Sequence, residues 1–287
     1  MEKFKVGIVG HGFVGQAVDY GFENDIVEKF YVDPKYDTTI DELANWNPNI
    51  TFVCLPTPMG ENGVVDSAAV EDAVLKVARL TKGAVILKST LPPNVIDSLC
   101  QTLFQYNLYK RFVYNPEFLT EKNSIEQYVY PHFHIVGGHE DACAAFGEVI
   151  DKFSIITPAP IIPMHPVEAS FVKYAINSFL ATKVTFFNQL YDAVKEHPTS
   201  RWNVIANAVS ADPRIGGSHT KVPGYDKKRG FGGACFPKDT NAFTMYTDKM
   251  SLLAKAIEIN NDYRLEYELD EREKEQNVSY KGKGTMQ

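Results

Sequence analysis

The chain has 287 residues, of which 44% are hydrophobic and 23% are charged, as in a soluble globular protein with one large or two ordinary domains. Its formal net charge of -7 gives no reason to expect nucleic acid as a partner, although a local basic pocket can still bind an anion. No apolar run approaches the ~20 residues that cross a bilayer, so the sequence predicts no membrane partner.

The first half of the chain alternates short β-type runs with helical stretches. Strands are predicted at residues 5–9, 30–32, 50–55, 84–88, 111–114 and 134–136. Helical periodicity is present in residues 14–22, 67–80, 95–106 and 140–153. This alternation predicts an α/β fold with a Rossmann-type, doubly wound parallel sheet that is covered by helices on both faces.

The second half predicts helices and no series of strands. A long helix is expected over residues 167–197, between Pro166 and Pro198. Lys173 and Asn177 are four residues apart and project from one face of this helix. Beside them runs one apolar stripe at helical spacing, which comprises Val172, Ala175, Ile176, Phe179, Phe186, Leu190 and Val194.

A proline-rich segment predicts the domain boundary. Residues 157–163 contain three prolines, which cannot sustain a helix, and we interpret them as the inter-domain connection. The predicted domains are therefore residues 1–163, with the sheet, and residues 164–287, which are mostly helical. Residues 262–276 are highly charged, and we expect them to be the solvated end of a helix before a polar tail that frays.

A glycine-rich segment follows the first predicted strand and opens a helix, and it consists of Gly10, His11, Gly12, Phe13, Val14 and Gly15. In a dinucleotide site, Gly10 permits the tight turn, Gly12 admits the pyrophosphate and Gly15 allows close helix–strand packing. The phosphates then lie on N–H groups at the positive end of the helix. The competing interpretation is a glycine-rich turn that binds no nucleotide.

An acidic residue at the end of the second strand supports the dinucleotide interpretation. Asp33 lies 18 residues after Gly15, where a carboxylate binds the ribose hydroxyls of the adenosine. A carboxylate there repels a 2′-phosphate, so NAD is favoured over NADP as cofactor, although the nearby Lys35 weakens that preference.

One of the four cysteines stands in a distinctive context. Cys235 follows the glycine-rich residues 230–233 and precedes Lys238 and Asp239. Glycines such as Gly232 let a ligand approach the backbone, and a nearby cation with oriented N–H groups favours the reactive thiolate. The alternative is a small core thiol. Because the cysteines are scattered, with no zinc-type spacing, we expect reduced thiols in a cytoplasmic protein and no metal site.

Three further segments follow predicted strands, at the ends where an open parallel sheet binds its ligands; they are residues 53–58, 88–93 and 115–121. Together with Lys173, Asn177, the segment Asp212-Pro213-Arg214-Ile215-Gly216 and the cysteine segment, they occur in a characteristic order. This ordered set closely resembles the UDP-glucose/GDP-mannose dehydrogenase family, from about residue 4 to residue 261.

The resemblance implies oxidation of the C6 alcohol of a nucleotide sugar, with UDP-glucose favoured, to a carboxylate by two NAD⁺. An aldehyde cannot lose a second hydride until a nucleophile adds to it, so the family uses a thiol to form a thiohemiacetal and then a thioester. The resemblance also implies a homodimer formed through the long helix, and a role in nucleotide-sugar metabolism and polysaccharide biosynthesis.

The resemblance implies these roles, residue by residue. Cys235 is the nucleophile, Lys173 and Asn177 face the reacting oxygen, Lys173 is also an acid/base candidate, and Asp239 manages protons or the hydrolytic water. Glu121 and Thr90 position substrate, water and nicotinamide, whereas Thr57 and Lys238 lie along the cofactor. Glu117, Phe118, Leu119 and Gly232 bind the substrate, and Arg214 contacts the substrate of a neighbouring subunit.

The chain departs from the family where members usually continue into a third domain that grips the nucleotide. Because that domain is expected to be absent here, we hypothesise that Lys227, Lys228 and Arg229 hold the pyrophosphate. Two alternatives stay open. One is a two-domain β-hydroxyacid dehydrogenase, which transfers a single hydride and does not need Cys235. The other is a catalytically degenerate protein that binds NAD or a nucleotide sugar.

Overall fold

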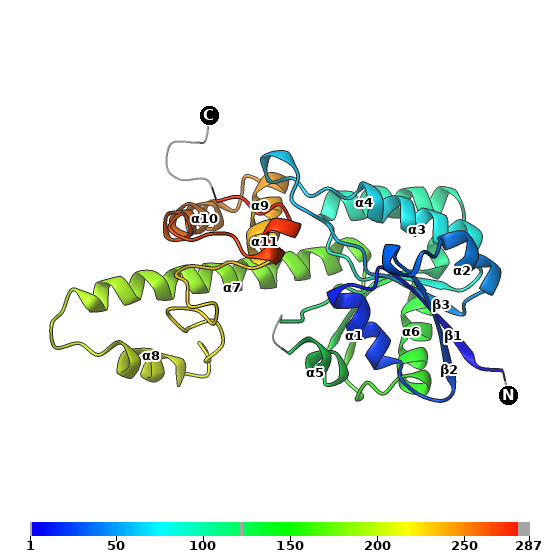
Figure 1. Cartoon of the computed structure of the whole chain (residues 1–287), viewed down its shortest axis with the longest axis horizontal. Coiled ribbons are helices and arrows are strands. Elements are labelled where there is room, and N and C mark those ends of the chain that lie inside the picture. The colour runs from blue at the N-terminus through cyan, green and yellow to red at the C-terminus, as the bar shows by residue number, and fades with distance from the viewer. Residues whose placement is uncertain (1, 121–122, 281–287) are drawn as a thin grey trace. The chain divides into compact units, whose positions relative to one another are not determined.

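The computed structural model describes residues 2–120 and 123–280 (Figure 1). The chain forms two compact units. The first, here called the sheet unit, comprises Met1–Thr57 and Asp66–Lys173, and the second, the helical unit, comprises Pro58–Val65 and Tyr174–Gln287. The division falls inside the long helix α7 (Pro166–Lys195). The predicted domain boundary after residue 163 stays a prediction.

The sheet unit is built on seven strands, β1 (Phe4–Val9), β2 (Val27–Val32), β3 (Ile50–Val53), β4 (Ala84–Leu87), β5 (Phe112–Tyr114), β6 (His134–Gly138) and β7 (Ile161–Met164). Their order is β2-β1-β3-β4-β5-β6-β7, and all neighbours are parallel except β5 and β6. The predicted parallel sheet is therefore confirmed, with one antiparallel pairing. The sheet grows in opposite directions from β1, so its switch point lies between β1 and β3, where such folds bind ligands.

Strand β7 corrects one expectation about the proline segment. Residues 157–163 were expected to be only a connection, but Ile161–Met164 pairs in parallel with β6. Pro163 is tolerated there because β7 is the last strand of the sheet, and an edge strand can carry a residue that has no N–H donor.

Helices cover both faces of the sheet (Figure 1), with α2 (Ile40–Trp46), α3 (Ala68–Leu80) and α4 (Pro93–Gln105) on one face and α1 (Phe13–Gly21), α5 (Ser124–Val129) and α6 (Glu140–Phe153) on the other. The four predicted helices α1, α3, α4 and α6 are present, whereas α2 and α5 were not predicted. Both are short. In α2, a capping box between Thr39 and Glu42 fixes the first turn, which apolar periodicity does not reveal.

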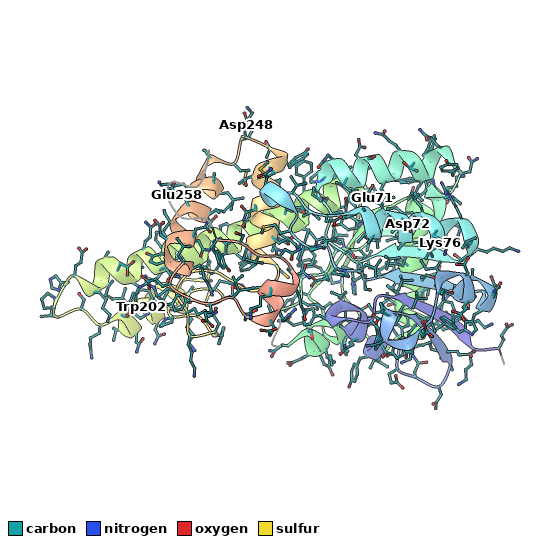
Figure 2. The ribbon with its side chains drawn as sticks, turned by 45° about the horizontal axis from the view of Figure 1, so that its top comes forward. Glu71, Asp72, Lys76, Trp202, Asp248 and Glu258 are labelled. Atoms are coloured by element: carbon teal, nitrogen blue, oxygen red, sulfur yellow. The ribbon has the colours of Figure 1, made fainter. Side chains whose placement is uncertain are left out.

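The strands alternate as expected for a sheet with two covered faces. Val6 and Ile8 on β1 are fully buried and pack into the cluster formed with α1, α5 and α6. On the opposite face, α3 buries Val70, Val74 and Val77 and directs Glu71, Asp72 and Lys76 outward (Figure 2). Burial of one such aliphatic side chain contributes roughly 1.5–3 kcal/mol, and these layers hold the strand ends in place.

The helical unit contains most of α7, then α8 (Trp202–Ser210), α9 (Phe236–Tyr246), α10 (Ser251–Arg264) and α11 (Glu271–Glu275). The ring of Trp202, which opens α8 (Figure 2), packs edge-on against Tyr191 of α7 at 5.3 Å between centroids. Within the described residues, no helix is both long and apolar enough to span a bilayer.

One expectation about this unit is wrong in part. The charged residues 262–276 are not a single solvated helix end, because α10 ends at Arg264, α11 follows, and Arg264 and Glu273 are only 3% and 1% exposed. The predicted apolar stripe of α7 includes Phe179 and Phe186, which are 69% and 58% exposed, so part of it lies outside the buried side of the helix. In both places, buried polar side chains find hydrogen-bond partners, so apolar character alone does not mark the buried face.

Candidate active site

The glycine turn after β1 has the geometry that a dinucleotide requires. Gly10 has φ +87°, in the left-handed region that favours glycine. A Cβ on Gly15 would lie 2.0 Å from the carbonyl oxygen of Gly10, whereas a Cβ on Gly12 would meet nothing within 4 Å. No side chain caps α1. The turn is therefore closely packed at Gly15 and open at Gly12, where a pyrophosphate must enter.

Asp33 ties the end of β2 to this turn. Its Oδ2 accepts a hydrogen bond from the backbone N–H of His11 at 2.7 Å, and its Oδ1 accepts one from Lys35 N at 3.1 Å. Burial alone raises the pKa of Asp33, but these two N–H donors outweigh it, and the pKa lies below its usual value. The ammonium of Lys35 donates to the carbonyl of His11 at 2.9 Å. Asp33 is therefore an anionic acceptor, as an adenosine ribose requires.

The ends of β4, β5 and β6 are tied together through one buried lysine. Lys88 Nζ donates to Asn115 Oδ1 at 2.6 Å, and Asn115 Nδ2 donates to the carbonyl of Ile135 at 2.7 Å. Thr57 and Thr90, the predicted threonines at strand ends, are 5% and 8% exposed. These contacts fix the edge of the sheet from which predicted site residues project.

Lys88 was not assigned a role from the sequence, although it ends an otherwise apolar strand run. It is 4% exposed, and burial lowers its pKa to about 8. The charges of Cys54 and Glu117 act against this lowering, and that of Lys173 adds to it. A lysine with a pKa near neutrality beside other ionisable groups is typical of functional sites.

Lys173 gathers the predicted substrate residues of the sheet unit. Its Nζ donates to the carbonyl of Glu117 at 2.5 Å, lies 3.6 Å from Glu117 Oε1, and stands 5.2 Å from the ring centroid of Phe118. Glu117 Oε2 also accepts a hydrogen bond from Leu119 N at 2.5 Å. The structure therefore brings these four predicted residues together. Glu121 lies outside the described residues.

A second group forms in the helical unit, at the start of α9. Asn177 Nδ2 donates to Asp239 Oδ2 at 2.6 Å, and Lys238 Nζ donates to Asp239 Oδ1 at 2.5 Å. All three side chains are at most 5% exposed. Cys235 lies at the N-cap of α9, and its carbonyl accepts from Asp239 N at 2.8 Å. The carboxylate of Asp239 is thus held beside the segment that carries the partly exposed Cys235.

The remaining predicted residues lie elsewhere in the helical unit. Gly232 packs against the guanidinium of Arg264, which a Cβ would approach to 2.5 Å. Arg214 is 88% exposed and donates to Asp212. Its contact with a neighbouring subunit stays a prediction.

The hypothesis that three consecutive cations hold the pyrophosphate loses support from two of them. Arg229 Nε donates to Asn188 Oδ1 at 2.7 Å, and its Nη2 pairs with Asp192 at 2.8 Å. Lys228 Nζ donates to the carbonyl of Glu268 at 2.6 Å. Both side chains therefore have partners within the unit.

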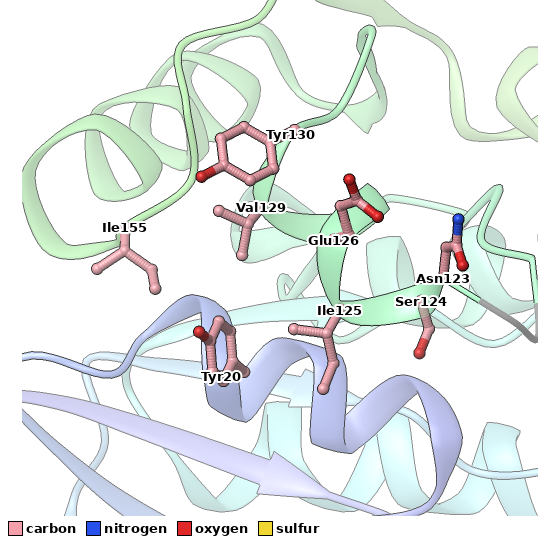
Figure 3. Close-up of a pocket in the computed structure, with 8 residues that line it drawn as sticks. All are labelled: Tyr20, Asn123, Ser124, Ile125, Glu126, Val129, Tyr130 and Ile155. Atoms are coloured by element: carbon pink, nitrogen blue, oxygen red, sulfur yellow. The ribbon is translucent and has the colours of Figure 1, made fainter.

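The sheet unit has an open hollow of about 600 Å³ that is distinct from the predicted site. Tyr20 of α1, Ile125 and Tyr130 around α5, and Ile155 after α6 point into it (Figure 3). Its lining contains none of the predicted site residues. The hollow therefore does not coincide with the predicted site residues.

Comparison with known proteins agrees with the motifs. Residues 24–153 match the NAD binding domain of the UDP-glucose/GDP-mannose dehydrogenase family, and residues 167–262 match its central domain. The chain belongs to this family. NAD is accordingly its cofactor, and the open glycine turn with Asp33 fits that molecule.

Individual relatives extend the comparison. The chain is 32% identical to UDP-glucose 6-dehydrogenase of Rickettsia typhi over 74% of its own length and 48% of the relative's. It is 30% identical to UDP-glucose 6-dehydrogenase TuaD of Bacillus subtilis over 84% and 52%. The chain thus spans about half the length of these curated relatives.

Solved structures show the same fold. A UDP-glucose dehydrogenase of Pyrobaculum islandicum superposes with a TM-score of 0.77 at 25% identity, over 91% of this chain and 68% of that one. A 3-hydroxyisobutyrate dehydrogenase of Mycobacterium tuberculosis shares the fold, with a TM-score of 0.64 at 15% identity over 88% and 91%.

Replacement of Gly12 by Ala tests the cofactor site. The added methyl meets no protein atom, so the free energy of unfolding should stay at the wild-type value, but the methyl occupies space that the pyrophosphate needs. We expect NAD affinity, measured by calorimetry, to fall at least about ten-fold. The control is Gly217→Ala, also at an open position, which should change neither property. Wild-type NAD affinity in Gly12→Ala would contradict the assignment.

Replacement of Lys88 by Met tests the buried cation. Between pH about 8 and 10.5, the unfolded chain holds the Lys88 proton while the folded chain releases it, so stability rises with pH in this window. Between pH 7.5 and 9.5, the free energy of unfolding measured with urea should rise by about 1–2 kcal/mol more in the wild type than in Lys88→Met. The control Lys76→Met, at a part-exposed lysine that pairs with Asp41, should keep the wild-type slope. Equal slopes in wild type and Lys88→Met would refute the lowered pKa.

Proposed function

We propose that the chain carries the cofactor site and catalytic groups of an NAD-dependent nucleotide-sugar 6-dehydrogenase, which oxidises a C6 alcohol to a carboxylate. UDP-glucose, oxidised to UDP-glucuronate, is the substrate we favour, because the relatives matched over most of this chain are named for it. The observation that carries the proposal is the buried Asn177–Asp239–Lys238 contact at the start of α9, the helix that directly follows Cys235. Residues 1–163 would bind NAD, and residues 164–287 would supply the catalytic Cys, Asn and Asp, together with Lys173.

The bound cofactor accepts hydride, and the protein's residues orient it. Gly12 leaves room for the pyrophosphate, while Gly10 and Gly15 keep the turn tight. Phe13 and Val14 lie in the first turn of α1, and Asp33 accepts from the adenosine ribose. Thr57, Thr90 and Lys238 would lie along the rest of the cofactor, as the family pattern implies.

The first oxidation needs no thiol. The C6 hydroxyl loses its proton to a base, for which the neutral amine of Lys173 is the candidate, and C6 loses a hydride, which leaves an aldehyde. The ammonium formed in this way donates to the Glu117 carbonyl. With the amide of Asn177, it would stabilise the negative charge that develops on the reacting oxygen.

The second oxidation uses Cys235. Its thiolate adds to the aldehyde carbon and forms a thiohemiacetal, which loses a second hydride and becomes a thioester. Water then breaks the C–S bond, releases the carboxylate and returns the thiol. The buried carboxylate of Asp239 would take the proton of that water. Four electrons leave the substrate as two hydrides, so each sugar reduces two NAD⁺.

A single-hydride dehydrogenase is the competing enzyme. The shared fold with 3-hydroxyisobutyrate dehydrogenase of Mycobacterium tuberculosis is compatible with it, but that likeness is one of fold alone. Such a reaction forms no thiohemiacetal, so it requires neither Cys235 nor the contacts around Asp239. A protein that only binds NAD or a nucleotide sugar would yield no NADH at all.

Stoichiometry with a Cys235→Ser variant tests the proposal. Incubated with NAD⁺ and a panel of UDP- and GDP-sugars, the wild type should form two NADH per molecule of one sugar. Cys235→Ser should lower the rate of complete oxidation at least about a hundred-fold, because no thiohemiacetal forms. The buried control Cys100→Ala should retain double oxidation. Full double oxidation by Cys235→Ser would overturn the mechanism, and one NADH per sugar in the wild type would favour the competing enzyme.

We also propose that the chain forms a homodimer through α7. Phe171, Phe179 and Phe186 recur at spacings of eight and seven residues, so they share one side of the helix, and they are 39%, 69% and 58% exposed. A row of exposed aromatic side chains along one helix is typical of an interface. The predicted cytoplasmic location and role in polysaccharide biosynthesis stay predictions.

The double variant Phe179→Asp/Phe186→Asp tests this interface. Both side chains are exposed, so the fold should persist, but buried carboxylates at the interface should abolish association. Sedimentation velocity should show a dimer for the wild type and a monomer for the variant. Phe104→Asp, at a 71% exposed position on α4, should stay dimeric. A monomeric wild type, or a dimeric double variant, would refute the proposal.

A further inference from the structure

The loop that leads to Cys235 is held by side chains from three helices. Gly230 N donates to Asn188 of α7 at 3.1 Å, and Phe231 N donates to Asn260 of α10 at 2.6 Å. Asn260 returns a hydrogen bond to the Phe231 carbonyl at 3.0 Å. A buried peptide group without a partner costs about 1–3 kcal/mol, so these side chains set the path of the loop.

The last of these contacts comes from α11. Gly233 N, two residues before Cys235, donates to Glu273 Oε1 at 3.0 Å. The same oxygen accepts from the hydroxyl of Tyr280 at 2.7 Å, and Oε2 accepts from Asp270 N at 3.0 Å. Glu273 is 1% exposed. A buried carboxylate is tolerated only when its oxygens are satisfied, and here each oxygen has a donor.

The segment that supplies Glu273 is fixed to the helical unit at several points. Met59 N donates to the carbonyl of Gln276 at 2.9 Å, and Val278 is buried. The capping box of Asp270 with Glu273 fixes the first turn of α11. This segment follows residue 262, where the match to the central domain of the family ends. The residues that complete the cysteine loop therefore come partly from outside the matched region.

We propose that Glu273 is a positioning residue for Cys235, an inference that rests on the proposed role of this thiol as nucleophile. The carboxylate holds Gly233, whose φ of +79° sets the turn into α9, and thereby places Cys235 at the N-cap, immediately before the first residue of that helix. Tyr280 holds the carboxylate in turn. A displacement of about 1 Å at a reacting group costs on the order of a hundred-fold in rate, so turnover depends on this contact.

Three variants of α11 isolate the effect. Glu273→Ala removes every hydrogen bond of the carboxylate, and Glu273→Gln keeps one oxygen for Gly233. The control is Glu271→Ala, on the same helix, because Glu271 is 83% exposed and pairs only with Lys274 among the described residues. We expect kcat to fall about 10–100-fold in Glu273→Ala, while KM for NAD stays within about two-fold of wild type. Glu273→Gln should recover much of kcat, and Glu271→Ala should match wild type.

Alkylation of the thiols supplies a readout that needs no substrate. Loss of the carboxylate frees the loop and removes a negative charge near Cys235, and both effects favour attack by its thiolate. Iodoacetamide at pH 7.5, followed by peptide mass mapping, should label Cys235 at least about three-fold faster in Glu273→Ala than in Glu271→Ala. Cys54, Cys100 and Cys143 are buried and should stay unlabelled, which distinguishes a released loop from an unfolded chain.

The outcomes separate this inference from the proposed function. Equal labelling rates of Cys235 in Glu273→Ala and Glu271→Ala overturn the inference, whatever the activity. If no nucleotide sugar yields NADH with wild type, the proposed function fails, and the labelling comparison still decides whether Glu273 controls the loop. If iodoacetamide labels all four cysteines in Glu273→Ala, that variant is unfolded and Tyr280→Phe is used in its place. An alkylation rate of Cys235 in Tyr280→Phe equal to that in Glu271→Ala then overturns the inference.

Discussion

The amide of Asn177 donates a hydrogen bond of 2.6 Å to the carboxylate of Asp239, and both side chains are almost fully buried. This contact exemplifies the constraint on which the site depends: α7 buries polar groups, and each must find a partner. One turn earlier on the same helix, Lys173 meets the Glu117 carbonyl in the sheet unit. Further along α7, the side chain of Asn188 accepts a hydrogen bond from the backbone N–H of Gly230. Because the partners are specific, they fix which backbone segments lie against α7.

In the sheet unit the same constraint operates at the carboxyl ends of the strands. Apolar layers of β1, β3 and β4 need no directional contacts, and they set the strands in order. At the end of β4, the Lys88 ammonium donates a hydrogen bond to the side chain of Asn115. The amide of Asn115 donates in turn to the backbone carbonyl of Ile135 on β6. Burial of the lysine lowers its pKa, and the Asn115 oxygen limits the cost of its charged form. The order of the strands and the hydrogen bonds of these buried polar groups together define the carboxyl-terminal edge of the sheet, where such folds bind ligands.

The sequence predicted what apolar periodicity and glycine chemistry control. Alternating apolar runs marked six of the seven strands, and positive φ at Gly10 agrees with the predicted turn. Pro163 concealed β7, since a proline is compatible with a strand only at an edge that no local pattern reveals. On α7 the prolines marked its ends well, but its apolar stripe does not coincide with its buried side, because Phe179 and Phe186 are exposed while Asn177 is buried. The polar residues were predicted from the order of motifs that the chain shares with the family, because apolar periodicity carries no information about them.

The charged stretch after α10 shows why composition cannot identify a buried charge. Glu271 and Glu273 are two residues apart on one short helix, so they point to nearly opposite sides, and they are 83% and 1% exposed. Nothing in the local sequence distinguishes these two carboxylates. The difference is made by the N–H of Gly233, forty residues earlier in the chain, which needs an acceptor at the point where α11 packs. A charged segment is therefore solvated only where the fold brings no donor to it, and near Cys235 the fold brings one.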